Sequence, residues 1–359
     1  MNEIKYKKGV GLDLGTNAIV RARLVETDEV VTTWIRDAFL NLKPTNKIVQ
    51  NTMRKGLEKA GISFLEKDDC FIIIGDDALN AAVERGLTTQ RPMSKGVVSP
   101  REAQALPIFK VLIKKVLGTP VEENEVCVYS VPASPVDAPF DSDFHSSMIN
   151  AILKDLGYKG VVMNEAQAIV YSELDDQDYT GIALSFGAGM VNVCISNGGE
   201  PVAVFATSKS GDYVDEKSAI ALGYDSTPGV YNEVTPSTVQ LTKETCHLDL
   251  TSPDPEDKSQ QAICTYYQSL MNYTIDNIVY QLKKLNPPPK FTQPIVMVVS
   301  GGTSKPKGFV ELFKKCVDKK LKEGELPFDI KEVRHAKEPL DSVARGCLLA
   351  SQLEYPDEE

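Results

Sequence analysis

The fold is decided by the stretch Val10-Gly11-Leu12-Asp13-Leu14-Gly15-Thr16-Asn17, which is repeated in outline by Ile182-Ala183-Leu184-Ser185-Phe186-Gly187-Ala188-Gly189-Met190. In each stretch an apolar strand reaches a small polar residue, turns on glycine and continues into a second strand. Two such hairpins, far apart in the chain, predict two lobes of similar design that face each other. The second copy carries Ser185 where the first carries Asp13, which leaves catalysis an open question.

Composition narrows the class of protein. The chain has 359 residues, enough for two lobes, and its 42% hydrophobic and 25% charged content is typical of a globular protein in solution. Its formal net charge of −11 argues against nucleic acid as a partner, because binding to a phosphate backbone depends on Lys and Arg. The same charge disfavours attraction to anionic lipid.

The cysteines and the apolar runs indicate the compartment. Seven cysteines without a Cys-x-x-Cys pair predict free thiols in a reducing cytosol rather than disulfides or a zinc site. The longest apolar runs, such as residues 294–299, are far shorter than the roughly 20 residues of a membrane-spanning helix. The short, lysine-rich N-terminus shows no leader and no amphipathic anchor. We therefore expect a cytoplasmic protein without a membrane anchor.

Strand and helix signals alternate along the chain, which predicts an α/β fold. Strands are expected at residues 8–14, 17–25, 71–75, 125–131, 161–163, 202–207 and 295–300. Helices are expected at residues 53–60, 101–117, 143–156, 165–174, 259–284, 308–321 and 341–353. The two hairpins indicate an internal duplication, in which a second strand-rich block begins at Gly160.

The first hairpin has the residues of a phosphate-binding loop. Asp13 ends an apolar strand, where its carboxylate can face a water molecule bound to Mg²⁺. Gly15 lets the backbone approach a phosphate because it has no Cβ, and Thr16 and Asn17 add hydroxyl and amide donors. An ordinary β-hairpin with a turn glycine explains the same residues as well.

Two further glycine turns follow apolar strands. The backbone N–H groups of Gly187, Ala188 and Gly189 can reach the other side of the same phosphates, although a tight turn needs these residues too. The segment Gly301-Gly302-Thr303 ends a buried strand, so that a base or ribose can lie against bare backbone at the carboxyl end of the sheet. A simple strand-to-helix loop is the alternative.

Glu165 lies at the start of an expected helix, with Asn164 as its N-cap. A carboxylate in this place can orient an attacking water molecule or accept its proton. Taken alone, the position is explained as readily by a favourable interaction with the helix dipole, worth about 0.3–1 kcal/mol.

The order of these features is more specific than any one of them. Hairpin, helix-start glutamate, second hairpin and Gly-Gly turn follow one another as in the superfamily of actins, heat-shock chaperones and sugar kinases, which the chain resembles over nearly its whole length. Within it, the chain resembles the bacterial actins, the branch of MreB and the magnetosome actin MamK. The similar stretches are Ile74-Gly75-Asp76-Asp77-Ala78, Arg91-Pro92-Met93-Ser94-Lys95-Gly96-Val97-Val98, Val131-Pro132-Ala133, Gly211-Asp212-Tyr213-Val214-Asp215-Glu216 and Pro339-Leu340-Asp341-Ser342-Val343-Ala344-Arg345-Gly346.

The resemblance implies an actin-like fold, in which two duplicated ribonuclease-H-like lobes flank a nucleotide cleft and each lobe carries a smaller inserted subdomain. The first large subdomain would comprise residues 1–32, 76–159 and 340–359, and the first small subdomain residues 33–75. The second large subdomain would comprise residues 160–212 and 285–339, and the second small subdomain residues 213–284.

The resemblance also implies the roles of individual residues in binding ATP or ADP with Mg²⁺. Asp13 would hold magnesium through water, and Glu165 would act on the hydrolytic water. The nucleotide-binding residues would be Gly15, Thr16 and Asn17 in the first loop, Gly187, Ala188 and Gly189 in the second, Gly211 and Asp212 at the cleft border, Lys243 and Glu244 at the ribose and base, and Gly301, Gly302 and Thr303 in the adenosine turn.

The second loop departs from the family pattern DxGxGTT(D/E). Ser185 replaces its first acid, Met190 and Val191 replace its two threonines, and Asn192 replaces its last acid. Loss of an outer-shell partner of a metal typically lowers metal affinity or activity by about 10–100-fold. We therefore expect nucleotide binding with slow or impaired hydrolysis. Whether the protein is an active ATPase stays an open question at this point.

The sequence leaves two functions open. The first is a bacterial actin-like cytoskeletal protein that binds ATP and polymerises head-to-tail with copies of itself, with adaptor proteins as further partners. The second is a nucleotide-gated scaffold or adaptor of the same fold that neither hydrolyses ATP nor forms filaments. Fold alone does not decide between them.

Overall fold

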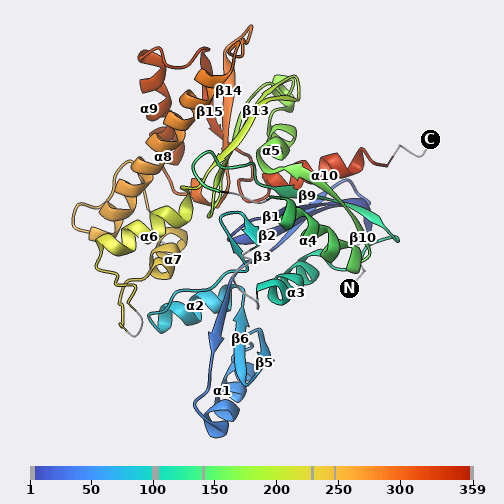
Figure 1. Cartoon of the computed structure of the whole chain (residues 1–359), viewed down its shortest axis with the longest axis vertical. Helices are drawn as coiled ribbons and strands as arrows, with labels where there is room; N and C mark the ends of the chain where they lie inside the picture. Colours follow the sequence, from blue (N-terminus) through green and yellow to red (C-terminus); the bar gives the residue numbers. More distant parts are fainter. Residues whose placement is uncertain (1–4, 99–104, 140–141, 228–229, 246–247, 356–359) are drawn as a thin grey trace.

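The computed structural model describes residues 5–98, 105–139, 142–227, 230–245 and 248–355 (Figure 1). Two five-stranded sheets form the centres of two lobes. The predicted α/β architecture of two duplicated lobes is confirmed, because the two sheets have the same design.

The first sheet has the strand order β10-β9-β1-β2-β3. Its strands are β1 (Tyr6–Leu14), β2 (Ala18–Val25), β3 (Val30–Arg36), β9 (Glu125–Val131) and β10 (Tyr158–Asn164). The first three strands are antiparallel, whereas β9 runs parallel to β1 and β10 runs parallel to β9. The glycine hairpin is the turn between β1 and β2.

The second sheet repeats this arrangement in the order β13-β12-β11-β14-β15. Its strands are β11 (Gly181–Phe186), β12 (Val191–Asn197), β13 (Glu200–Thr207), β14 (Ile295–Ser300) and β15 (Ile330–His335). Again three antiparallel strands are followed by two parallel ones. The second glycine hairpin, between β11 and β12, therefore occupies the position of the first.

Two helices lie between the sheets and join the lobes. The helix α10 (Ser342–Gln352) packs on β1 and β9 of the first sheet, and α5 (Glu165–Glu173) packs on β11 and β12 of the second. They cross at Gly346, where an added Cβ would lie 1.9 Å from the carbonyl oxygen of Ala168. Only glycine allows this approach, and a shared apolar layer that includes Val343 and Ile169 surrounds the crossing.

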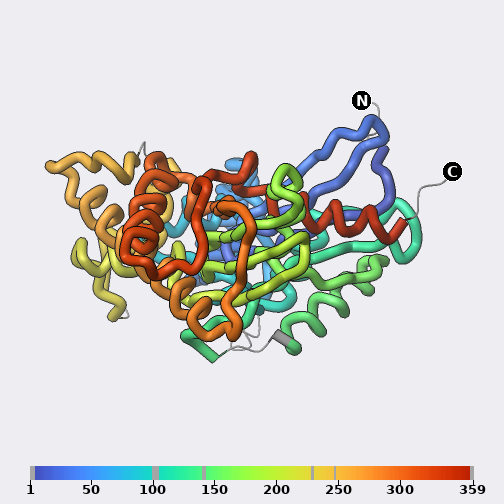
Figure 2. The backbone as a smooth tube through the Cα atoms, turned by 90° about the horizontal axis from the view of Figure 1, so that it is seen from above, coloured from blue at the N-terminus to red at the C-terminus, as the bar shows by residue number. Residues whose placement is uncertain are grey.

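Other helices cover the outer faces of the sheets (Figure 2). In the first lobe these are α3 (Ala105–Leu117) and α4 (Ser142–Asp155), and in the second α8 (Lys258–Lys284) and α9 (Phe309–Lys322). The core of the second lobe includes T-shaped contacts of Phe186 with Phe309 and Phe313. None of the helices in the described residues is both long and apolar enough to cross a bilayer.

Smaller units extend from both lobes. The strands β4 (Phe39–Leu42), β5 (Phe64–Lys67) and β6 (Cys70–Ile74) form a separate sheet with α1 (Lys47–Lys59) and α2 (Asp76–Glu84), seen at the bottom of Figure 1. A short hairpin of β7 (Met93–Ser94) and β8 (Val97–Val98) follows. In the second lobe, α6 (Gly211–Ala221) and α7 (Pro236–Thr245) pack together beside α8.

Two of the expected divisions of the chain do not follow the first sheet. The strand at residues 161–163 does not open the second lobe: it is part of β10, which pairs with β9 in the first sheet. The expected division between residues 32 and 33 falls inside β3. The division of the chain into four subdomains otherwise stays a prediction. Of the helix expected at residues 101–117, residues 101–104 lie outside the described residues.

Candidate functional site

One cavity of about 530 Å³ lies where the two lobes meet. It is open at the carboxyl ends of the parallel strands, where α/β sheets generally bind ligands. All the residues expected to bind a nucleotide or act on water line it except Asp212, which lies beside it on the first turn of α6. The lining residues of that set are Asp13, Gly15, Thr16, Asn17, Glu165, Gly187, Ala188, Gly189, Gly211, Lys243, Glu244, Gly301, Gly302 and Thr303.

The two glycine loops approach each other so closely that a side chain would not fit. A Cβ on Gly189 would lie 2.6 Å from Thr16 Oγ1 and 3.0 Å from the amide nitrogen of Gly96. The same Gly96 N–H donates to Thr16 Oγ1 over 2.9 Å. The loops of both lobes therefore form one floor, with glycine where the backbones meet.

The Gly-Gly turn after β14 is fixed to the second loop. Gly301 has φ +89°, and a Cβ there would lie 2.4 Å from the carbonyl oxygen of Phe186. Thr303 Oγ1 donates to the carbonyl of Gly187 over 2.8 Å. A Cβ on Gly211 would in turn lie 2.3 Å from Thr303 Oγ1. This corner of the cavity is therefore bare backbone, as a flat ligand requires.

Two acidic side chains, Asp13 and Glu165, line the cavity. Burial raises the pKa of Asp13 to about 6, although a hydrogen bond from Ser130 Oγ (2.7 Å) lowers it and Asp341 raises it further. Burial and the charge of Asp13 raise the pKa of Glu165 to about 8, against the effect of a hydrogen bond from Ser185. Because burial and a neighbouring acid both disfavour an ionised carboxyl, a cation bound beside these residues would stabilise their charged forms.

The residues that depart from the family pattern contact Glu165 directly. Ser185 Oγ donates to Glu165 Oε1 over 2.5 Å, and Asn192 Nδ2 donates to Glu165 Oε2 over 2.8 Å. The other amide atom of Asn192, Oδ1, accepts from the N–H of Ala133 over 2.8 Å and so is fixed in orientation. Each carboxylate oxygen thus has one neutral donor from β11 or β12.

These donors act on the charge of Glu165 as well as on its position. A hydroxyl and an amide stabilise the ionised carboxylate, whereas acids at the same two places would repel it. The sequence identified both replacements but not that both touch Glu165.

The expected residues Lys243 and Glu244 are each paired. Lys243 Nζ lies 2.7 Å from Asp215 Oδ1, and both side chains are buried. Burial raises the pKa of Asp215 to about 6, and Lys243 lowers it in part. Glu244 binds Arg36, a residue that the sequence patterns did not single out.

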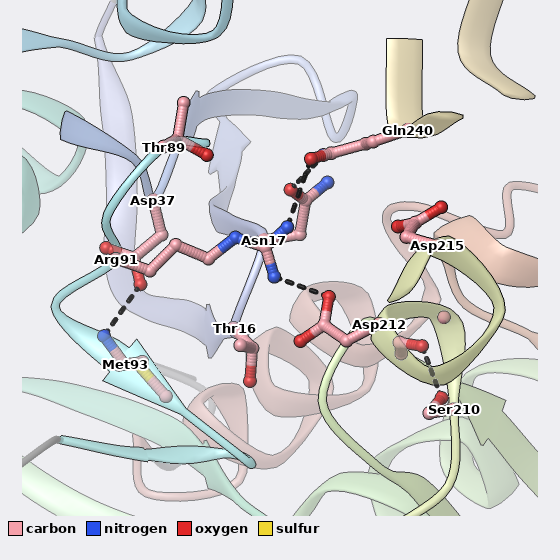
Figure 3. Close-up of polar contacts among 12 residues, drawn as sticks. Thr16, Asn17, Asp37, Thr89, Arg91, Met93, Ser210, Asp212, Asp215 and Gln240 are labelled. Carbon is pink, nitrogen blue, oxygen red and sulfur yellow. Dashed lines mark hydrogen bonds and ion pairs between the residues drawn. The ribbon is translucent and has the colours of Figure 1, made fainter. Parts of the chain in front are cut away.

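Two arginines of the first lobe reach across to the second. Arg91 Nη1 lies 2.6 Å from Asp212 Oδ1, and Figure 3 shows this pair beside Gln240 and Asn17. Arg36 and Arg91 both line the cavity. Arg91 lies in one of the stretches that resemble bacterial actins, and this resemblance could have identified it from the sequence. Arg36 lies in no such stretch, so no sequence pattern gave a reason to single it out.

The oxygen ligands present suit magnesium only together with phosphates. In the part of the chain that the structure describes, no three His, Cys, Asp or Glu side chains are grouped to hold a metal. Mg²⁺ is commonly bound through one or two carboxylates, water and substrate phosphates. The buried Asp13 carboxylate meets that requirement.

Comparison with solved structures shows the fold. Over 96% of this chain and 98% of its own, the MamK double helical filament is 19% identical with a TM-score of 0.65. MreB 5 of Spiroplasma citri bound to AMPPNP is 13% identical, with 96% of each chain covered and a TM-score of 0.63. The ethanolamine utilization protein EutJ from Carboxydothermus hydrogenoformans is 14% identical over 97% of this chain and 92% of its own, with a TM-score of 0.55.

These likenesses agree with the duplicated sheets and the cavity between them. No curated protein matches the sequence. The model of one protein family, Volactin, matches residues 9–351. The chain therefore belongs to the Volactin family.

Proposed function

We propose that this protein binds ATP or ADP with Mg²⁺ in the cavity between its lobes and polymerises head-to-tail into cytoplasmic, cytoskeletal filaments, with slow hydrolysis. The observation that carries the proposal is the meeting of both glycine loops and the Gly301-Gly302 turn around one cavity of about 530 Å³. That volume is in the range of sites for ligands of nucleotide size. AMPPNP bound to MreB 5, which has a similar fold, supports it.

Each part of the cavity suits a different part of the nucleotide. The N–H groups of Gly15 and Gly187 donate to the carbonyls of Ala18 and Met190 within their own turns. The other backbone N–H groups of the two loops would face the phosphates, and the Asp13 carboxylate would hold Mg²⁺ through water. A bound Mg²⁺ would neutralise part of the charge on the phosphates. The turn at residues 301–303 leaves space for the base and ribose, with the paired Lys243 and Glu244 at its border.

Slow hydrolysis follows from the contacts of Glu165. A general base must be ionised to take a proton from the attacking water. Burial and the charge of Asp13 raise the pKa of Glu165 to about 8, against the hydrogen bond from Ser185, so most of its carboxyl holds a proton near neutral pH. Ser185 offers a hydroxyl where an acid would hold the water shell of the metal. The hydrogen bonds from Ser185 and Asn192 therefore orient Glu165, but no acid at position 185 helps to place the metal and its water for hydrolysis.

Filament formation is supported by the likeness to MamK, whose structure is a double helical filament. Head-to-tail contacts join two different surfaces of the same chain, and they extend into a filament when the rotation between copies does not close a ring.

The alternative is a nucleotide-gated scaffold or adaptor that does not polymerise. The hydrogen bonds of Ser185 and Asn192 to Glu165 favour it, because a site adapted to hold nucleotide without hydrolysis would have such contacts. The fold alone does not decide between the two functions, because one fold can serve several.

High-speed pelleting with Mg²⁺ and ATP, ADP or AMPPNP separates the two, with phosphate release followed in the same samples. Trp34, the sole tryptophan, lines the cavity, so quenching of its fluorescence reports binding independently of assembly. Binding with nucleotide-dependent pelleting supports the filament. Binding without pelleting at any salt or protein concentration supports the scaffold, and absence of quenching with every nucleotide contradicts both.

A further inference from the structure

Two arginines connect the lobes across the mouth of the cavity. Arg36 ends β3, and Arg91 lies between α2 and β7; both belong to the first lobe. Their partners Asp212, Gln240 and Glu244 lie on α6 and α7 of the second lobe, with Gln240 and Glu244 one helical turn apart.

Arg36 binds Glu244 through a bidentate, charge-assisted pair of hydrogen bonds. Its Nη1 lies 3.0 Å from Glu244 Oε1 and its Nη2 lies 2.6 Å from Glu244 Oε2. Its Nε also donates to Asp76 Oδ1 over 2.7 Å, which fixes the guanidinium from its own side. Only 7% of the Arg36 side chain is exposed, so solvent screens this fork less than it screens a surface pair.

Arg91 makes a parallel connection. Its Nη1 donates to Asp212 Oδ1 over 2.6 Å, and its Nη2 donates to Gln240 Oε1 over 3.1 Å. The Arg91 side chain is 16% exposed. Burial lowers the pKa of Arg91, but the charge and hydrogen bond of Asp212, together with Asp215, raise it above its ordinary value and so favour the cationic guanidinium.

Gln240 joins both connections to the first glycine loop. Its Nε2 donates to Asn17 Oδ1 over 2.7 Å and to Glu244 Oε1 over 3.1 Å. Arg36 Nη1 also donates to Asn17 Oδ1, over 3.2 Å. A ligand held by this loop therefore lies directly behind the interlobe contacts, and must break them to leave on this side.

We propose that Arg36 and Arg91, with Asp212, Gln240 and Glu244, form a latch across the cavity mouth whose opening sets the rate at which nucleotide is exchanged. The inference rests on the proposed nucleotide binding and adds its regulation. Neutral contacts support the same closed arrangement: the N–H of Thr89 donates to Ser237 Oγ over 3.0 Å, beside the latch.

The test measures release of a fluorescent (mant) ATP analogue after a chase with unlabelled ATP. Arg36→Gln and Arg91→Gln are each expected to speed release about tenfold, and higher salt is expected to speed release in the wild type but not in the double variant.

Arg54→Gln is the matched control. Arg54 forms a similar fork with Glu66, at 2.6 Å, on the first small unit away from the cavity, so its loss is expected to leave release unchanged. Unchanged release in both Arg36→Gln and Arg91→Gln, with nucleotide still bound, would overturn the latch and leave the proposed binding intact.

Hydrogen exchange separates the latch from the binding proposal. In the protein without nucleotide, the backbone amides of α7 are expected to exchange faster in the Arg36→Gln, Arg91→Gln double variant than in the wild type or Arg54→Gln. If the wild type binds no nucleotide, the proposed function fails. The hydrogen-exchange rates of α7 then decide by themselves whether the arginine contacts hold the lobes together. Equal exchange in all three proteins would overturn the latch.

Discussion

Burial and the charge of Asp13 raise the pKa of Glu165, and the hydroxyl of Ser185 lowers it in part. We predict that Ser185→Asp lowers the melting temperature of the nucleotide-free protein, because a carboxylate would replace a donor 2.5 Å from Glu165 Oε1 and add a third acid near Asp13. Mg²⁺ with ATP should reverse the loss and raise phosphate release by about 10–100-fold, since the new acid supplies an outer-shell partner of the metal. Thermal melts and phosphate assays over a magnesium titration measure both effects.

Ser185→Ala is the control for the added charge. It removes the donor without introducing a carboxylate, so its melting temperature should not depend on magnesium more than that of the wild type. If Ser185→Asp and Ser185→Ala melt alike at every magnesium concentration, the role assigned to this position is wrong.

The residues of the site were more predictable from sequence than their contacts. Asp13, Glu165 and the loop glycines were identified by type and order, and the structure places them on one cavity. The contacts from Ser185 and Asn192 to Glu165 were not foreseen, because they join two strands to a helix 20 and 27 residues away. Such contacts depend on how the sheets align, which no local pattern encodes.

At the scale of elements, the crossing of α5 and α10 has no spare volume. We predict that Gly346→Ala lowers stability by about 1–3 kcal/mol, as overpacking of a filled core typically does. The added Cβ would meet the backbone carbonyl of Ala168, at 1.9 Å, which no side-chain rotation relieves. Urea denaturation followed by circular dichroism measures the change.

The same substitution at Gly56 should act in the opposite direction. Gly56 lies within α1, and a Cβ there would meet no atom within 4 Å. Gly56→Ala should therefore stabilise the protein by up to about 1 kcal/mol through helix propensity alone. Equal effects at the two positions would show that the crossing is not packed as described.

Helices were foreseen where packing and periodicity agree and missed where tertiary contacts decide. The expected helices at residues 259–284 and 341–353 correspond to α8 and α10, and the predicted N-cap of α5 at Asn164 is confirmed by its bonds to Ala166 and Gln167. The helix α7 was missed because four of its ten residues are threonine or valine, which have low helix propensity. Its contacts with α6 and α2 hold it in place.

At the scale of the whole molecule, each lobe has its own apolar core and the cavity lies at their junction. The sequence predicted this division because each half repeats the same hairpin. It placed β10 in the wrong lobe because a short strand after a helix does not reveal which neighbour it pairs with. At this junction burial raises the pKa of Asp13 and of Glu165, so their ionised forms lower stability there in favour of binding.

That balance predicts the effect of Asp13→Asn. The folded-state pKa of Asp13 is raised from 3.8 to about 6, so the folded protein holds this proton more firmly than the unfolded chain. Wild-type stability therefore falls as pH rises from about 4 to 6, and above pH 6 the buried charge lowers stability by up to about 3 kcal/mol. Without nucleotide, Asp13→Asn should be more stable than the wild type at pH 8, and its advantage should vanish as pH falls towards 4.

With Mg²⁺ and ATP the order of stability of the two proteins should reverse, because only the carboxylate holds the metal. A variant that is less stable at pH 8 without nucleotide, or that gains as much stability from Mg²⁺ and ATP as the wild type, would contradict the role given to Asp13.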